Sequence, residues 1–142
     1  MNSRQQFDEL SYYTLTHPSP AFLHQLAVDA HTAQTADESS KTIAIFFALM
    51  GLYLVVERGW TGRQVQLAHM RLAPRKSQLP RPLLPADRGT MTVTDVLAAT
   101  PGEVRDRAIH AWCESVWQAF CTGAPTTREV VAGFLKTSLD IE

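Results

Sequence analysis

The amino-acid sequence predicts an all-α protein, a single-domain bundle of about five main helices packed around a buried central helix. The first observation is a run of fourteen residues without a charge, IAIFFALMGLYLVV, from Ile43 to Val56. A helix that is apolar on every side has no face for solvent, so the rest of the chain must cover it. The second observation is that nearly every other apolar segment follows a helix-start signal, and the third is that no segment alternates convincingly with period two.

The central helix is expected at about 39–58. Its alanine, leucine and methionine residues favour helix over strand, and the run is shorter than the roughly 20 apolar residues that cross a bilayer. Side-chain oxygens within residues 37–40 could cap its start, and Gly59 suits a left-handed end. Gly51 lowers helix stability by roughly 1 kcal/mol relative to alanine, which indicates that another helix approaches closely there, so Gly51→Leu should overpack the core.

Two helices are expected before the central one. Ser3 and Gln6 have capping-box spacing at the start of a helix that runs to roughly Leu15. The sequence HPSP at 17–20 then breaks the chain. Its Ser19 as N-cap and Pro20 at the first helical position predict a second helix, which extends over residues 20–35.

A fourth helix and a loop follow the central helix. Thr61 and Gln64 form another capping box, which opens a helix that stops before Pro74. The segment 74–89 holds four of the eight prolines of the chain. Because proline removes a hydrogen-bond donor and fixes φ, this segment is predicted to be an extended loop laid over the helices. Its expected anchors are Leu79, Leu83 and Leu84.

Three more helices are expected in the C-terminal part of the chain. A short helix over 93–99 begins with the sequence TVTD at 92–95. A longer helix follows TPGE at 100–103, which supplies a cap, a proline at the first position and a glutamate at the third, and it ends at Gly123. A last helix begins at Thr126.

Length and charge restrict the class of protein. A chain of 142 residues forms one domain of ordinary size, here 1–142. The net charge of −1 gives no global field that would attract nucleic acid or an acidic membrane. No apolar segment follows a basic start, so no secretory signal is expected. Cys113 and Cys121 would lie about 12 Å apart along one helix, too far for a disulfide, which favours a cytoplasmic protein.

The five histidines are the first candidates for chemistry, because helical bundles can hold metal sites in their interior. His24 and His31 are seven residues apart, whereas chelation from one helix normally uses a spacing of three or four. Further ligands for a divalent metal would have to come from other helices. The candidate ligands are His24, His31, Asp29, His69 and His110.

A second set of candidates lies in the long helix near the C-terminus. His110, Cys113 and Glu114 have helical spacing that could place a thiol near an imidazole, although a cysteine among tryptophans is more often a small core residue. Trp112 and Trp117 cannot both point into one groove, and core packing is the default for both. The motifs GxSxG, GxGxxG, HExxH and the P-loop are absent from the sequence, so the corresponding enzyme classes lack support.

The segment between Arg71 and Arg88 carries five positive residues and one acid, Asp87. Such a loop could bind phosphate or a nucleic-acid backbone, or a partner could recognise its prolines. It lacks interleaved aromatic residues, so stacking on single strands is unsupported. A solvated surface loop is the simpler account.

Several segments together resemble a family of uncharacterised bacterial proteins that is grouped only as a domain of unknown function. The segments are LHQLAVDAHTAQ (23–34), ALMGLYLVVERG (48–59), MTVTDVLAA (91–99) and AWCESVWQAF (111–120). Members are similar in having a histidine before a short apolar run and an aspartate, where His24 and Asp29 stand, and a tryptophan pair like Trp112 and Trp117. Many begin with a cysteine-rich, zinc-ribbon-like segment that this sequence does not contain. The resemblance implies no activity, but it directs attention to His24, Asp29 and Gln34.

The leading interpretation is a non-catalytic cytoplasmic helical bundle that binds a small molecule or a protein partner through a groove between helices. The alternative is a metal-dependent enzyme with a histidine-containing site. A third hypothesis is a regulatory protein that uses the basic proline-rich loop. A homodimer is one option for the partner, because apolar faces on every helix could need a second subunit. Binding to nucleic acid or to a membrane is not expected.

Overall fold

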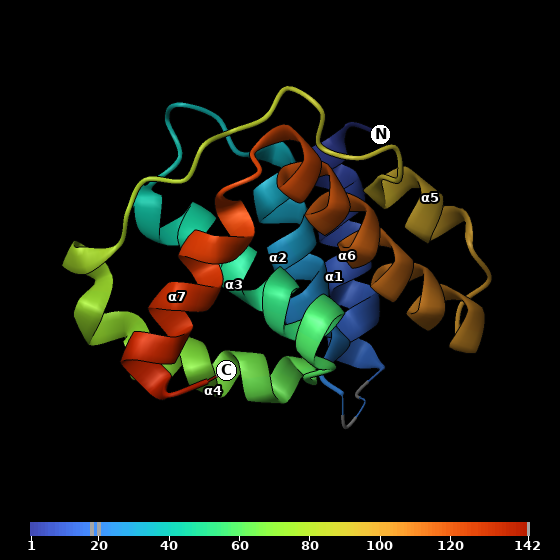
Figure 1. Ribbon diagram of the computed structural model, residues 1–142. Helices are drawn as coiled ribbons and strands as arrows, with labels where there is room; N and C mark the ends of the chain where they lie inside the picture. The colour runs from blue at the N-terminus through green and yellow to red at the C-terminus, as the bar shows by residue number, and fades with distance from the viewer. Residues whose placement is uncertain (18, 20, 142) are drawn as a thin grey trace.

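The computed structural model describes residues 1–17, 19 and 21–141, and all regular secondary structure in these residues is helical (Figure 1). Six long helices are present, one more than the predicted five, together with a short α5 and a 3₁₀ helix, η1. Their bounds are α1 Ser3–Thr16, α2 Leu23–Thr35, α3 Thr42–Arg58, α4 Gly62–Leu72, η1 Ala73–Gln78, α5 Val93–Ala98, α6 Glu103–Gly123 and α7 Thr127–Leu139. None of the described helices combines the length and apolar character needed to cross a bilayer.

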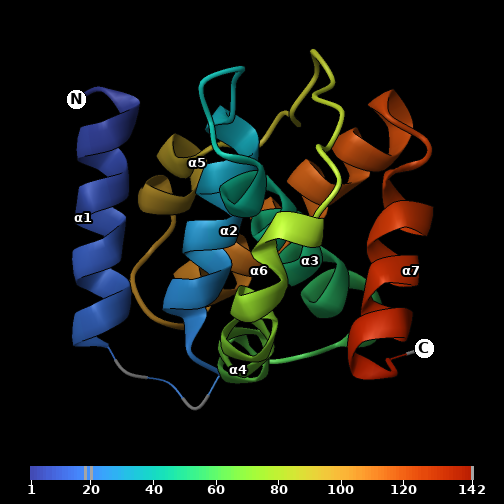
Figure 2. The same cartoon turned by 90° about the vertical axis from the view of Figure 1, so that its left-hand side faces the viewer.

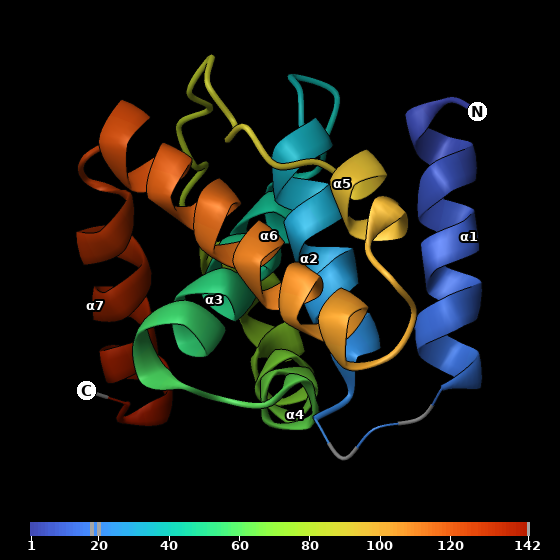
Figure 3. The same cartoon turned by 90° about the vertical axis from the view of Figure 1, so that its right-hand side faces the viewer.

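The helices are arranged around α3, as the apolar run predicted. Figures 2 and 3 show α1 and α7 at opposite sides of the molecule with α2, α3 and α6 between them, while α4 lies below. Residues 48–54 of α3 are all buried, as are Ile45 and Phe46. Phe46 also meets Phe134 of α7 edge-on, with ring centroids 5.2 Å apart. The buried central helix is therefore confirmed.

Both ends of α3 follow from local chemistry. The helix begins at Thr42, later than the expected 39, because residues 37–40 form a separate turn in which Asp37 Oδ1 accepts hydrogen bonds from the backbone nitrogen and hydroxyl of Ser39. At the other end Gly59 has φ of 69°, the left-handed conformation that glycine adopts without strain.

Gly51 is the point where other helices approach α3, as predicted. A Cβ atom placed on Gly51 would overlap the carboxyl group of Asp29 from α2 and would lie 3.2 Å from Cγ1 of Val65 from α4. Only a residue without a side chain leaves room for this arrangement.

The predicted starts of the first two helices are wrong in position. The cap of α1 is Asn2, whose side chain pairs with Gln5, one residue earlier than the predicted Ser3 and Gln6. Helix α2 begins at Leu23, because Phe22 takes a left-handed φ of 51° and interrupts the helix. The predicted Pro20 start lies outside the described residues.

Helix α6 begins at Glu103 after Gly102 rather than with Thr100 as its cap. The hydroxyl group of Tyr13 contributes to this start, because it accepts a hydrogen bond from the Gly102 nitrogen at 2.8 Å and donates one to Asp106 Oδ1 at 2.9 Å. A contact with α1 thus sets the beginning of α6.

The predicted extended loop 74–89 is partly wrong, because residues 73–78 form η1, with Pro74 in its first turn. Proline is tolerated at this position because the nitrogens of a first helical turn have no helical acceptor. The chain from 79 to 92, called here the proline segment, then passes over one end of the bundle (Figure 1). Leu79 is buried and Leu84 is partly buried, but Leu83 is 64% exposed and does not anchor the segment.

Candidate functional site

Asp29 is the buried carboxylate of the bundle. Its Oδ1 atom accepts a hydrogen bond from Gln25 Nε2 at 3.0 Å, whereas its Oδ2 atom has no partner among the described residues. Burial raises the pKa of Asp29 well above its usual value, which the hydrogen bond from Gln25 only partly offsets. The carboxyl group therefore favours its neutral, protonated form, in which it is a poor metal ligand.

Cys113 of α6 is a core residue close to Asp29 and is not paired with an imidazole. Its thiol lies 3.6 Å from the Leu26 carbonyl oxygen of α2, and burial raises the pKa of Cys113 far above that of a free cysteine. His110 and Glu114 are exposed on the same helix. The thiol–imidazole hypothesis is therefore wrong, since the thiol is buried and held in its protonated form.

Three of the candidate histidines make contacts within the chain. His24 Nδ1 is 3.0 Å from Thr14 Oγ1, His31 stacks on Phe7 with ring centroids 4.1 Å apart, and His69 stacks on Phe47. The Nε2 atom of His69 donates to the Phe47 carbonyl oxygen at 2.9 Å.

Burial lowers the pKa of all three histidines, and for His69 it does so to about 4. No group of three or more histidine, cysteine, aspartate or glutamate side chains with metal-binding geometry occurs in the part of the chain that the structure describes. The structure thus does not bring the candidate ligands His24, His31, Asp29, His69 and His110 together.

Gln34 joins α2 to two distant parts of the chain. Its Nε2 atom donates to the carbonyl oxygens of Met91, at 2.7 Å, and Arg88, at 3.2 Å, and its Oε1 atom accepts from Trp112 Nε1 at 2.9 Å. The side-chain amide of Gln34 therefore uses both its nitrogen and its oxygen in hydrogen bonds, and Trp112 is fully buried. These two candidate residues connect α2, α6 and the proline segment.

Two arginines of the proline segment bind backbone carbonyl oxygens at the ends of helices. The guanidinium group of Arg88 donates to Ala33 at 3.0 Å and to Ala36 at 2.9 Å, at the C-terminal end of α2. Arg81 donates to carbonyl oxygens of the turn between α2 and α3, including that of Ser40. Both charges therefore hold the segment on the bundle, which leaves them poorly placed to bind an external phosphate.

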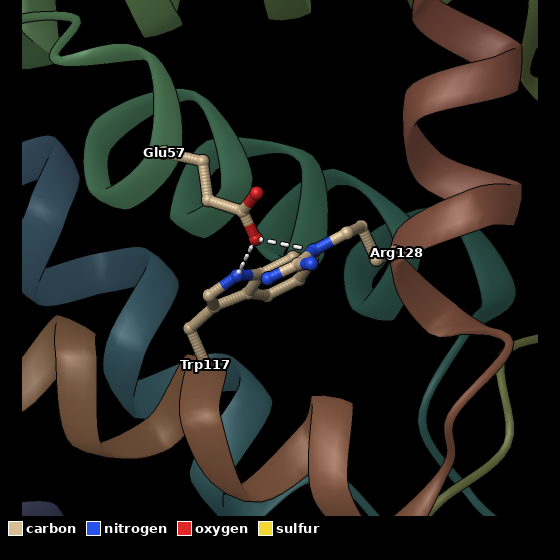
Figure 4. A network of polar contacts seen from close by, with 3 residues as sticks. All are labelled: Glu57, Trp117 and Arg128. Atoms are coloured by element: carbon tan, nitrogen blue, oxygen red, sulfur yellow. Dashed lines mark hydrogen bonds and ion pairs between the residues drawn. The ribbon is translucent and has the colours of Figure 1, made fainter.

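Trp117, the last of the tryptophan candidates, is part of a polar contact between three helices (Figure 4). Its Nε1 atom donates to Glu57 Oε2 at 2.6 Å, and Arg128 of α7 forms an ion pair with the same oxygen at 2.8 Å. Figure 4 shows the Trp117 side chain from α6 and the Arg128 side chain from α7 reaching the same carboxylate oxygen of Glu57. Sequence reasoning missed Glu57 and Arg128, because no local pattern relates positions 71 residues apart.

Hollows on the surface lie between segments that are distant in the sequence. One of about 80 Å³ lies between the proline segment and α7, and one of about 590 Å³ lies beside Gln34 and Arg88. Another, of about 240 Å³, is called here the α4–α7 hollow. It is lined by Trp60, Gln64, Leu67, Ala68, Arg71, Leu139 and Ile141.

One wall of the α4–α7 hollow lies in the most basic part of the chain, whereas the other, Leu139 and Ile141, adjoins Asp140. Residues 58–86, called here the basic segment, contain six arginine or lysine residues and no acid, whereas the remaining residues contain seven basic and fourteen acidic ones. None of the three ion pairs among the described residues involves the basic segment. Sequence reasoning counted only the loop from Arg71 to Arg88 and so missed that the positive charge extends over α4.

Comparisons place the chain in one family and give no closer relative. No curated protein and no solved structure matches it. A family model described as "Family of unknown function (DUF5946)" matches residues 4–121, which include α1 to α6 almost completely and exclude α7. Because this match covers far more than half of the sequence, the chain belongs to that family of unknown function, as the resemblance had indicated.

Proposed function

We propose that this protein is a non-catalytic binding protein and that its partner is another protein. The observation that carries the proposal is the α4–α7 hollow, an open and mainly apolar surface that Arg71 borders. Leu67, one of the residues that line it, is 51% exposed, and Met70, one turn further along α4, is 66% exposed. Exposed apolar side chains that gather at a hollow mark an interaction surface, whereas scattered ones do not.

The contacts of the reactive side chains support a binding role over a catalytic one. Gln34, Trp112 and Trp117 hold helices together, and the thiol of Cys113 is buried. The metal-dependent enzyme remains the alternative function. Elemental analysis of untagged protein separates the two, because about one equivalent of a transition metal would favour the enzyme.

A small molecule is a less suitable partner than a protein. Small-molecule sites are concave, and they bury most of the ligand between apolar walls and a few polar groups. The hollow of about 590 Å³ beside Gln34 is open and bordered by Asp37 and Glu38. We place the protein in the cytoplasm, which two free cysteines, Cys113 and Cys121, support.

Selection from a displayed library of helical peptides tests the proposal without assuming the composition of the partner. Peptides selected on the wild-type protein should fail to bind the double variant Leu67→Glu/Met70→Glu. The matched control is Tyr12→Glu/Val104→Glu, which changes two other exposed apolar residues on α1 and α6. Selected peptides that bind the two double variants equally, or a selection without binders, would overturn the proposal.

A further inference from the structure

We infer that the occupant of the α4–α7 hollow is an acidic amphipathic helix of a partner protein. This inference rests on the proposed function and adds to it the chemistry of the partner. The hollow and its surroundings supply two features that such a helix would match, an apolar strip and flanking positive charge.

The apolar strip runs along the outer side of α4 toward the end of the chain. Trp60, Leu67, Ala68, Leu139 and Ile141 line the hollow, and Met70 lies one helical turn beyond Leu67. Leu139 is the last residue of α7 and Ile141 follows it after Asp140, so two separate segments form the two walls. A groove of this kind receives an amphipathic helix through apolar residues at spacings of three and four.

Positive charge flanks this strip on α4 and on η1. Arg71 lines the hollow, and Arg63 lies on the same side of α4, four residues before Leu67. The guanidinium group of Arg63 donates to Gln66 Oε1 at 2.6 Å and lies 4.7 Å from the centroid of the Phe22 ring, so Arg71 borders the hollow directly and Arg63 does not. Arg75 lies on the α7 side, where its guanidinium group donates to Ser138 Oγ at 3.2 Å. None of these three arginines has a carboxylate partner among the described residues. Acidic residues beside the apolar face of a bound helix would supply the missing partners.

An acidic helix fits this surface better than nucleic acid does. Nucleic acid would use the charge but would leave the apolar walls without contacts, and Trp60 is the only aromatic residue that lines the hollow within the described residues. The rest of the chain carries twice as many acids as basic residues, so a polyanion that extends beyond the basic segment would meet repulsion.

A membrane surface is also a poorer fit. Binding to a bilayer requires apolar residues that protrude into it, and here five of the apolar side chains line a hollow. A concave surface complements a convex helix, with its rows of side chains, better than it complements a nearly flat lipid surface.

A designed peptide provides the test. It is an 18-residue fluorescein-labelled helix with leucine at spacings of three and four and glutamate at the flanking positions, and its partner peptide replaces every glutamate with lysine. Fluorescence anisotropy on the full-length protein should show binding of the acidic peptide alone. Added salt should weaken this binding, because the flanking contacts are ionic. Leu67→Glu should weaken it by about 30-fold, because a charge would replace a central apolar contact.

Reversal of the arginine charges on α4 tests whether the binding depends on those charges. The double variant Arg63→Glu/Arg71→Glu should lose affinity for the acidic peptide by about tenfold or more and should gain affinity for the lysine peptide. Arg107→Glu on α6 is the matched control, because Arg107 is exposed and lies outside the basic segment. Thermal unfolding of each variant verifies that the fold is retained.

Four outcomes would overturn the inference. The first is equal binding of both peptides. The second is that the protein binds duplex DNA or phosphatidylserine vesicles more tightly than the acidic peptide and that Leu67→Glu abolishes this binding. The third is that sedimentation equilibrium shows a homodimer which Leu67→Glu dissociates. The fourth is a library selection that yields binders sensitive to Leu67→Glu but without acidic residues. This last result would retain the proposed binding function and reject only the acidic partner.

Discussion

Asp29 of α2 and Gly51 of α3 lie so close together that the side chain at each position limits the size of the side chain at the other. The carboxyl group of Asp29 occupies the space where any larger residue on α3 would place its Cβ atom. Because its Oδ2 atom has no hydrogen-bond partner among the described residues, this contact does not satisfy the carboxyl group. A buried polar atom without a partner lowers stability, so the position is a candidate for a role other than packing.

The pair leads to a double-mutant test. Gly51→Ala should lower the free energy of unfolding by about 1–3 kcal/mol through overpacking against the Asp29 carboxyl group. Asp29→Ala removes that group, so Gly51→Ala should be far less harmful in the Asp29→Ala background. Urea unfolding of the four proteins gives the coupling energy between the two sites.

Gly133 of α7 provides the control for this test. No atom lies within 4 Å of a Cβ placed on Gly133, so Gly133→Ala should stabilise the protein by up to about 1 kcal/mol through helix propensity. If Gly51→Ala behaved like Gly133→Ala, α2 would not constrain α3 at this crossing.

At the scale of elements, the proline segment is held on the bundle by polar contacts as well as by leucines. Arg88 donates to carbonyl oxygens at the end of α2, and Gln34 donates back to carbonyl oxygens of the segment. The guanidinium group of Arg88 also lies 5.5 Å from the centroid of the Phe120 ring of α6. This reciprocal arrangement ties one extended segment to two helices.

Removal of these contacts should release the segment. Arg88→Ala should lower the free energy of unfolding by about 1–3 kcal/mol, because several buried carbonyl oxygens lose their donor. Hydrogen exchange should accelerate over residues 79–92 and much less in α3. Arg75→Ala is the control, because Arg75 is exposed and makes a single hydrogen bond to Ser138. Unchanged exchange in Arg88→Ala would show that Leu79 and Leu84 suffice to hold the segment.

The sequence predicted those elements whose ends depend on local contacts. The capping box of Thr61 with Gln64 and the helix start at residues 92–95 are confirmed, because each depends on residues only three positions apart. The start of α2 could not be predicted in the same way. Its left-handed Phe22 adjoins Ala21, whose carbonyl oxygen accepts from the Gly62 nitrogen at 2.6 Å, a contact with α4.

The candidate binding surface consists of positive charge and a hollow, and only the charge was predictable from the sequence. The absence of acids between Glu57 and Asp87 can be read directly from the sequence. The hollow cannot, because its walls join α4 to Leu139 and Ile141, about seventy positions later in the chain. Only the packing of α7 against α3 brings these segments together.

For the whole molecule, burial of ionisable groups makes stability depend on pH in two opposing ways. The pKa of His69 falls from its usual value near 6.5 to about 4 in the fold. Between these values the unfolded chain binds a proton that the folded chain does not, so stability is lost as the pH falls. The lowered pKa values of His24 and His31 act in the same direction.

Asp29 acts in the opposite direction. Its raised pKa means that the folded protein retains a proton that the unfolded chain has already released above pH about 4. Its contribution is therefore fully present at low pH and is lost as the pH rises toward the raised pKa. The histidines thus destabilise the fold on the acidic side, and Asp29 destabilises it toward neutral and alkaline pH.

Two variants separate these contributions in urea unfolding measured from roughly pH 4.5 to 8, a range that lies above the ordinary pKa of aspartate and spans that of histidine. His69→Gln retains a side-chain N–H for the Phe47 carbonyl oxygen but does not titrate. Relative to this variant, the wild type should lose up to about 3 kcal/mol between neutral pH and pH 4.5. Asp29→Asn should gain stability relative to the wild type as the pH rises, because asparagine does not titrate. A carboxyl group that is excluded from water and has one oxygen without a partner should ionise less readily in the fold than in the unfolded chain. Parallel pH profiles of stability for the wild type and Asp29→Asn would contradict this expectation.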